Sequence, residues 1–355
     1  DEIIHAKGFG VSDLEKGTAV TPETTFAIGS STKAFSSALV AMMVDEGKLD
    51  WDDPASKYIE GFKLQIKSDD ADDEPTLRDL LSHRTGFARM GMLSIAGKVP
   101  RYRMFAYASK AEPVADFRDE FHYNNLTYMA GSLPAAKVAG TTWEELLQTR
   151  LLDPLGMENT NSSYADAQKD PNWSKGYSWR EDLKEHELEP MRNIDQIAPA
   201  GAINSSVLDM TKWLRLQLGN GTFEGKELIS KKNLLKTRRD VIAISRGAVD
   251  YGMGWMLHEW GEEDDKKKVV EHGGNIDGYA AEVAMLPDER ARVNVLIPGA
   301  RALRLEGPVK RVNGGADLWL KDSQGLSWRI HLSEEGTSWM ARPSVAAPPW
   351  TLTRE

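Results

Sequence analysis

The chain contains no cysteine among its 355 residues. Disulfides, thiolate nucleophiles and Cys-based zinc sites are therefore excluded. Long apolar runs are missing too, since no stretch approaches the ~18 residues that a membrane-spanning helix requires. Residues 1–10 alternate in polarity and do not resemble a signal peptide. We expect a soluble protein with no membrane span, whose compartment stays open between cytoplasmic and exported.

Positive charge is also scarce. The 44 Lys and Arg residues are outnumbered by 54 Asp and Glu residues, which leaves a formal net charge of −10 at pH 7. Such a balance argues against nucleic acid or an anionic membrane as a partner. The histidines show no metal-ligand spacing, so we expect neither a metal nor a cofactor. The Gly-x-Ser-x-Gly, His-Glu-x-x-His, P-loop and dinucleotide motifs are absent, which removes α/β-hydrolase, zincin and nucleotide-binding interpretations.

The order of secondary-structure signals predicts an α+β fold. A strand is expected at 3–11, and helix signals then occupy the middle of the chain at 30–46, 76–82, 125–138, 142–153 and 206–218. Strands return late, at 251–258, 269–272, 279–286 and 291–297. This order suggests an α/β sandwich: an antiparallel sheet built from N- and C-terminal strands, flanked by helices, with a mostly helical insertion.

The first candidate site is Gly29-Ser30-Ser31-Thr32-Lys33, which opens the most apolar helical stretch. Residues at i and i+3 are neighbours on a helix surface, so Lys33 can reach the Ser30 oxygen. The first turn also offers free N–H groups and a dipole that favours negative charge. A lysine buried in an apolar helix has a lowered pKa and can act as a base. The alternative is a serine N-cap beside a solvated lysine.

Two further segments have residues suited to acyl transfer. In Tyr123-Asn124-Asn125, the tyrosine can exchange protons with a serine, with its pKa lowered by a nearby cation, and Asn125 can contact both a carbonyl and a lysine. On its own, a helix cap with a half-buried tyrosine is the favoured interpretation. In His272-Gly273-Gly274-Asn275, glycines at a strand end permit close approach of a substrate and an N–H of an oxyanion hole. A plain turn is the alternative there.

Together, Ser-x-x-Lys, Tyr-x-Asn and His-x-Gly resemble the motif set of the serine β-lactamase and penicillin-binding-protein superfamily. The Tyr-x-Asn form is typical of the branch that contains class C β-lactamases, D-stereospecific peptidases and family VIII carboxylesterases. The resemblance extends over about residues 1–298 and includes 80–86, 199–201 and 251–255. It implies a β-lactamase/transpeptidase-like fold.

The resemblance also implies catalytic roles. Ser30 would be the acylated nucleophile, and Lys33 and Tyr123 would share the general-base and general-acid work. Which of these two takes the serine proton is left open at this point.

Further residues would bind the substrate. Asn125 would hold the substrate carbonyl, and the backbone N–H groups of Ser30 and Asn275, beside Gly274, would form the oxyanion hole. His272 stands where many relatives have lysine. Because histidine is only partly charged at neutral pH, it favours esters over β-lactams and would be at most a weak anchor for a carboxylate, or would polarise the tyrosine.

The resemblance therefore predicts a serine hydrolase, first of all a carboxylesterase for short acyl esters. A D-amino-acid peptidase or amidase and a weak class C-like β-lactamase are the nearer alternatives. A catalytically silent binding or scaffold protein on the same fold is the alternative of another class. The expected partner is a small-molecule ester or amide, and a homo-oligomer stays open.

The resemblance to this superfamily also suggests where the catalytic domain ends. We expect a catalytic domain over 1–298, with sheet regions at about 1–50 and 245–298 and a helical region at about 51–244. Within the C-terminal segment 299–355, residues 315–340 could hold strands of a small β-rich unit.

Overall fold

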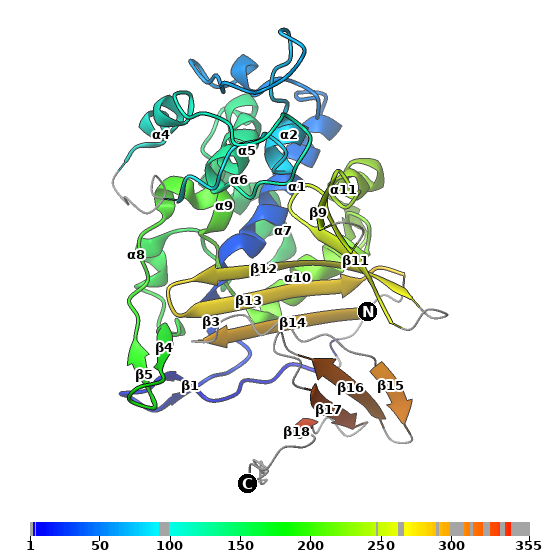
Figure 1. Ribbon diagram of the computed structural model, residues 1–355. Coiled ribbons are helices and arrows are strands. Elements are labelled where there is room, and N and C mark those ends of the chain that lie inside the picture. The colour runs from blue at the N-terminus through cyan, green and yellow to red at the C-terminus, as the bar shows by residue number, and fades with distance from the viewer. Residues whose placement is uncertain are drawn as a thin grey trace.

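A six-stranded antiparallel sheet lies at the centre of the computed structural model (Figure 1). The structure describes residues 3, 5–91, 99–245, 248–261, 266–288, 291–298, 309–312, 315–321, 327–333 and 338–341. The strands follow the order β14-β13-β12-β11-β10-β9. Their bounds are β9 Ile242–Ser245, β10 Val249–Tyr251, β11 Met256–Trp260, β12 Lys267–Ile276, β13 Tyr279–Leu286 and β14 Ala291–Pro298. The predicted α+β class is confirmed.

The helices lie behind the sheet and above its β12 side (Figure 1). Their bounds are η1 Gly29–Ser31, α1 Thr32–Asp45, η2 Ala55–Lys57, α2 Leu77–Leu81, α4 Arg101–Ala108, α5 Asn125–Ala139, α6 Trp143–Leu147, η3 Gln148–Leu152, α7 Asp153–Leu155, α8 Tyr164–Ala167, η4 Asp195–Ile197, α9 Ala198–Gly201, α10 Val207–Leu218 and α11 Lys231–Thr237. None of the described helices is long and apolar enough to cross a membrane.

Helix α1 forms the centre of the hydrophobic core. Twelve of its residues, Thr32–Met43, are buried, which agrees with its apolar composition on all sides. The ring of Phe35 stacks on that of Trp213 in α10, with centroids 3.9 Å apart. This packing fixes the axis of α1, and with it the position of the turn that precedes the helix.

The N-terminal strand does not join the main sheet, contrary to the prediction. All six strands of that sheet come from residues 242–298. The first strand is β1 Val11–Asp13, which pairs with β2 Thr18–Ala19 in a separate two-stranded sheet. Gly8 and Gly10 are the physical reason: glycine weakens a strand, and Gly10 has φ +70°, which ends the extended run where it turns into the hairpin.

The remaining small sheets also lie outside the central one. β3 Thr25–Ala27 pairs with β6 Asn204–Ser206, directly before the turn that carries Ser30. Two hairpins complete the set, β4 Tyr177–Arg180 with β5 Glu185–Leu188 and β7 Thr222–Phe223 with β8 Lys226–Glu227.

Strand β12 is longer than predicted and has an unpaired stretch. Its pairing with β11 ends where Glu271 meets Met256, whereas its pairing with β13 continues to Ile276. Residues 272–275 therefore belong to the strand and form a local edge on the β11 side, rather than a turn. This edge contacts η1.

A second antiparallel sheet follows in the C-terminal segment. It consists of β15 Val309–Val312, β16 Gly315–Lys321, β17 Ser327–Ser333 and β18 Ser338–Ala341, in that order. The strands expected between 315 and 340 are therefore present. The extended tail expected at 342–350 lies outside the described residues, and the domain boundary at 298 stays a prediction.

Candidate active site

Ser30 lies in the short turn η1 between β3 and α1, and its side chain caps neither element. Ile28 is the N-cap of η1 and Ser31 that of α1, and neither side chain makes a capping hydrogen bond. Gly29 enters the turn at φ +50°, a conformation that favours glycine. Ser30 is partly buried, and its hydroxyl is available for partners outside these elements.

Lys33 lies one helical turn beyond Ser30 and points back to it. Its Nζ is 3.1 Å from Ser30 Oγ, 2.7 Å from Asn125 Oδ1 and 2.7 Å from the Ala200 carbonyl oxygen. All three partners are neutral oxygens. The Lys33 amine therefore contacts both Ser30 in η1 and Asn125 in α5, two residues that are far apart in the sequence.

Burial controls the charge of Lys33. The side chain is completely buried, and Nζ lies 4.7 Å and 5.4 Å from the ring centroids of Tyr123 and Tyr128. Burial is the main reason that the pKa of Lys33 lies well below that of a lysine in water, and the charge of Arg89 lowers it further. The neutral amine is therefore favoured.

Tyr123 approaches Ser30 from the start of α5. Its hydroxyl donates a 2.7 Å hydrogen bond to Ser30 Oγ. Asn124, the next residue, is the N-cap of α5 and accepts hydrogen bonds from the N–H groups of Leu126 and Thr127. Asn124 therefore caps the helix, while its neighbour Tyr123 contacts the serine.

The pKa of Tyr123 shifts in the direction opposite to the expected one. Burial raises the pKa of Tyr123 to about 12, although the Ser30 hydrogen bond and the Arg89 charge both act to lower it. Desolvation of a phenolate outweighs the nearby cation here. The tyrosine is consequently a protonated donor near neutral pH.

His272 lies behind the site, with its side chain only 1% exposed. Its Nδ1 is 2.7 Å from the Gly273 carbonyl oxygen, and its Nε2 is 3.0 Å from the Tyr251 hydroxyl. Because a carbonyl only accepts, Nδ1 carries the hydrogen and Nε2 accepts from the tyrosine. Burial is the main reason that the pKa of His272 is lowered to about 3.

Gly274 and Asn275 bring β12 against the serine turn. A Cβ on Gly274 would lie 1.8 Å from the Ile28 carbonyl oxygen, and one on Gly29 would lie 2.8 Å from the Asn275 nitrogen. Ser31 Oγ ties the two elements together by donating a 2.8 Å hydrogen bond to the His272 carbonyl oxygen. Residues without side chains are therefore required on both sides of this contact.

Three residues near the serine were not assigned a role from the sequence. Ala200 supplies a carbonyl oxygen to Lys33, His83 lies under the Tyr123 ring, and the exposed Arg89 has its guanidinium carbon 5.5 Å from that ring's centroid. Ala200 and His83 lie in segments that carried the family resemblance, which was the only signal for them.

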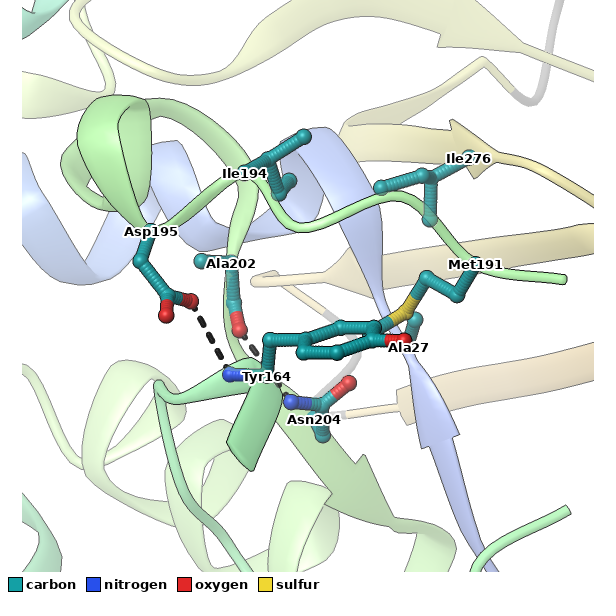
Figure 2. Close-up of a pocket in the computed structure, with 9 residues that line it drawn as sticks. Ala27, Tyr164, Met191, Ile194, Asp195, Ala202, Asn204 and Ile276 are labelled. Atoms are coloured by element: carbon teal, nitrogen blue, oxygen red, sulfur yellow. Dashed lines mark hydrogen bonds between the residues drawn. The ribbon is translucent and has the colours of Figure 1, made fainter. Parts of the chain in front are cut away.

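An apolar recess adjoins the site on the side of α9 (Figure 2). The space within it is too narrow to admit a water molecule. Gly201 lines it and also touches the serine turn, since a Cβ there would be 3.7 Å from the Gly29 carbonyl carbon. Figure 2 shows the other labelled lining residues: Ala27, Tyr164, Met191, Ile194, Asp195, Ala202, Asn204 and Ile276.

A mixed fold that holds a serine hydroxyl between a buried amine and a phenol is of the β-lactamase type, a class of hydrolases. The chain belongs to the beta-lactamase family, whose model, described as Beta-lactamase, matches residues 1–304. The superfamily expected from the three motifs is thereby confirmed.

Two solved structures share this fold. The octameric penicillin-binding protein homologue from Pyrococcus abyssi superposes with a TM-score of 0.74 at 22% identity, covering 96% of this chain and 89% of that one. A penicillin binding protein from Bacillus halodurans gives a TM-score of 0.67 at 19% identity, over 83% and 87% of the two chains. At these identities the likeness shows the fold alone.

Curated relatives match over most of this chain. The unguisins hydrolase ungD of Aspergillus violaceofuscus is 29% identical over 321 residues, which cover 81% of this chain and 54% of the relative. Protein flp of Staphylococcus aureus is 24% identical over 303 residues, covering 82% and 56%. The chain thus spans about half the length of the curated relatives it matches.

Proposed function

We propose that the protein is a serine hydrolase that forms an acyl-enzyme on Ser30, and that its main substrates are short acyl esters. The observation that carries this proposal is the position of Ser30 Oγ, 3.1 Å from a fully buried lysine amine and 2.7 Å from a tyrosine hydroxyl. A serine hydroxyl is a weak nucleophile until a base removes its proton, and such a base lies within reach.

In this mechanism Lys33 is the general base. A neutral amine has two hydrogens and one lone pair. The hydrogens point to Asn125 Oδ1 and the Ala200 carbonyl oxygen, so the lone pair is left for the Ser30 hydroxyl. As Oγ attacks the substrate carbonyl carbon, its proton passes to Lys33.

Tyr123 is then the general acid. When the tetrahedral intermediate collapses, the leaving oxygen takes the phenolic proton, which leaves a Tyr123 phenolate near the Lys33 ammonium. In deacylation the phenolate takes a proton from the attacking water, and the Lys33 ammonium returns its proton to Ser30 Oγ, so that both groups are restored. A phenol with a pKa of about 12 stays protonated until it is needed.

The oxyanion hole is proposed to consist of the backbone N–H groups of Ser30 and Asn275. The close contact of Gly274 with the serine turn supports this assignment, because it holds the local edge of β12 beside Ser30. Preorganised N–H donors stabilise charge that develops in the transition state. Asn125 is proposed to orient both Lys33 and the substrate carbonyl.

The preference for esters over β-lactams rests on His272. The side chain is buried and neutral, and its two ring nitrogens face Tyr251 and Gly273. It therefore offers no cation to a substrate carboxylate, so we assign His272 a structural role beneath the site.

A D-amino-acid peptidase or amidase is the second candidate, and Arg89 is the observation that favours it. Arg89 is an exposed, permanent cation beside the Tyr123 ring, where it could meet a substrate carboxylate. The relatives named unguisins hydrolases support the broader hydrolase class.

A substrate panel tests the proposal. Short-chain p-nitrophenyl esters, D-amino-acid amides and a chromogenic cephalosporin are compared for the wild type and Ser30→Ala. We expect kcat/KM to be highest for the esters and to vanish in the variant. Faster turnover of the amides, lost in Arg89→Gln, would replace the ester assignment with the second candidate. If the wild type is no faster than Ser30→Ala on every substrate, the hydrolase proposal is wrong, and a catalytically silent protein on the same fold replaces it.

A further inference from the structure

His83 lies directly beneath Tyr123, in the loop that follows α2. Its side chain is fully buried, and its backbone has φ +62°. A residue other than glycine rarely adopts this conformation, which costs free energy and recurs at functional sites. Its ring Nε2 is also buried and makes no hydrogen bond to any residue that the structure describes. Both features reduce stability, so packing alone does not explain the residue.

His83 holds the chain on both sides of Tyr123. Its carbonyl oxygen accepts a 2.8 Å hydrogen bond from the N–H of His122. Its Nδ1 accepts a 3.1 Å hydrogen bond from the N–H of Asn124. Between these two bonds, the imidazole lies against the tyrosine ring, with centroids 4.4 Å apart. The backbone on either side of Tyr123 and its ring are therefore fixed by one residue.

This contact requires a neutral imidazole. A backbone N–H can only donate, so Nδ1 must be unprotonated and the hydrogen of the ring resides on Nε2. Burial is the main reason that the pKa of His83 lies well below its usual value. The rings of Tyr128 and Tyr251, with centroids 5.3 Å and 5.1 Å away, surround the imidazole and exclude water.

We propose that His83 is a positioning residue, which holds the Tyr123 hydroxyl on Ser30 and places Asn125 at Lys33. This inference rests on the proposed function, and it adds that His83 sets the positions of Tyr123 and Asn125 relative to Ser30 and Lys33. Asn124, which His83 binds, is the N-cap of α5, and Asn125 is the first residue of that helix. A shift of the 122–124 backbone would thus displace both the acid and the amide from Ser30, and about 1 Å of misplacement can cost about 10²-fold in rate.

The test compares variants at position 83 in the full chain. His83→Asn keeps an acceptor at the place of Nδ1, and asparagine tolerates positive φ. His83→Gln carries its amide oxygen one bond further out, and His83→Ala has no acceptor. We expect His83→Ala to lower kcat for p-nitrophenyl acetate about 10²-fold with little change in KM. His83→Asn should recover most of that loss, and His83→Gln should not.

Ser82→Ala is the matched control. Ser82 is equally buried and donates a hydrogen bond to the Arg78 carbonyl oxygen, so its loss reports structural damage in the same loop. We expect Ser82→Ala to lower the melting temperature while kcat changes little. Equal kcat for wild type and His83→Ala would overturn the proposal, as would equal kcat for the Asn and Gln variants. The second comparison holds even if His83→Ala does not fold.

Amide hydrogen exchange separates this inference from the proposed function. The N–H groups of residues 122 and 124 should exchange faster in His83→Gln than in wild type, and His83→Asn should restore protection at 124. If the wild type turns over no substrate, the hydrolase proposal fails and this exchange pattern decides the role of His83. Unchanged exchange at 124 in His83→Gln would show that the residue does not hold the tyrosine segment.

Discussion

At the scale of single residues, the chemistry of the site depends on ionisable side chains that are buried and that burial keeps in their neutral form. Lys33, His83 and His272 are each at most 1% exposed, and burial is the largest cause of the lowered pKa of each. Arg89 is then a nearby group that stays charged and exposed. The site is a neutral amine and a neutral phenol at one serine oxygen.

Replacing Lys33 with methionine should abolish acylation while the protein stays folded. Methionine fills the buried volume, and removing the amine deletes the general base, a change that costs about 10²–10⁴-fold. Stopped-flow release of p-nitrophenol measures the acylation rate, and circular dichroism checks the fold. An unchanged acylation rate in Lys33→Met would show that another group is the general base.

The rate should rise with pH and then stay level. At a pH below its pKa, Lys33 is protonated and cannot act as a base. Because burial holds that pKa well below the value of a lysine in water, the rate should reach its plateau at a lower pH than an ordinary lysine base would allow. Loss of the acid begins only near the Tyr123 pKa of about 12. Removing the Arg89 charge raises the pKa of Lys33, so the rise in kcat/KM should move to higher pH in Arg89→Gln and stay in place in Arg89→Lys.

A bell-shaped profile with a fall between pH 7 and 9 would contradict this assignment. A shift to lower pH in Arg89→Gln would contradict the role of the arginine charge.

His272→Ala should destabilise the protein rather than change its substrate preference. The variant leaves the buried Tyr251 hydroxyl without its acceptor, which costs about 1–3 kcal/mol. Chemical denaturation measures the loss, and Tyr251→Phe is the control, because the same substitution at 272 should cost less in that background. An unchanged free energy of unfolding, together with a new substrate order, would favour a binding role for His272.

The sequence predicts these residues unevenly. The Ser30, Lys33, Tyr123 and Asn125 motifs were sufficient to bring those side chains together in the prediction. The states of His83 and His272 were not predictable, because they depend on a positive φ and on contacts with Tyr251, Asn124 and Gly273 that only the folded chain creates.

At the scale of elements, the site is a junction of one turn, one strand edge and two helices. The turn η1 stands between β3 and α1, and the edge of β12 beyond Glu271 lies against it. The first residue of α5 is Asn125, and Tyr123 lies just before the helix. Strand length and β-branched or aromatic content made the late strands predictable. Glycines lie at both places where the strands differ from the prediction: Gly8 and Gly10 lie within the strand expected at 3–11, and residues 273–274 lie inside β12, where a turn was an open alternative.

Gly274→Ala should damage the site far more than Gly273→Ala. The new Cβ would lie 1.8 Å from the Ile28 carbonyl oxygen, so backbone must move, whereas at Gly273 its nearest atom is the end of the Glu282 side chain at 2.9 Å. We expect Gly274→Ala to lower acylation about 10²-fold and stability by about 1–3 kcal/mol. Equal kinetics of the two variants would show that β12 does not set the serine turn.

At the scale of the whole molecule, the described residues around Ser30 all lie before residue 299. The central sheet ends with β14, and the C-terminal strands form a sheet of their own. The family match to residues 1–304 is consistent with this division. The sequence could not establish the boundary, since residue content predicts strands but not the sheet that they join.

A chain shortened to residues 1–298 should fold and keep its acylation rate. It retains β14, which pairs with β13 along its whole length from Ala291 to Pro298. A chain shortened after Leu286 is the control, because it lacks β14 and exposes the edge of β13. Failure of the 1–298 chain to fold would move the domain boundary into the C-terminal segment.

In the proposed mechanism, Ser30 carries the acyl group during turnover. The direct measurement is rapid acid quenching of the protein with p-nitrophenyl acetate, followed by mass spectrometry of the intact chain and its peptides. We expect one acetyl group per chain, on Ser30, that forms in the wild type and is absent from Ser30→Ala and Lys33→Met. An acetyl group on another residue, or turnover without any acylated chain, would contradict it.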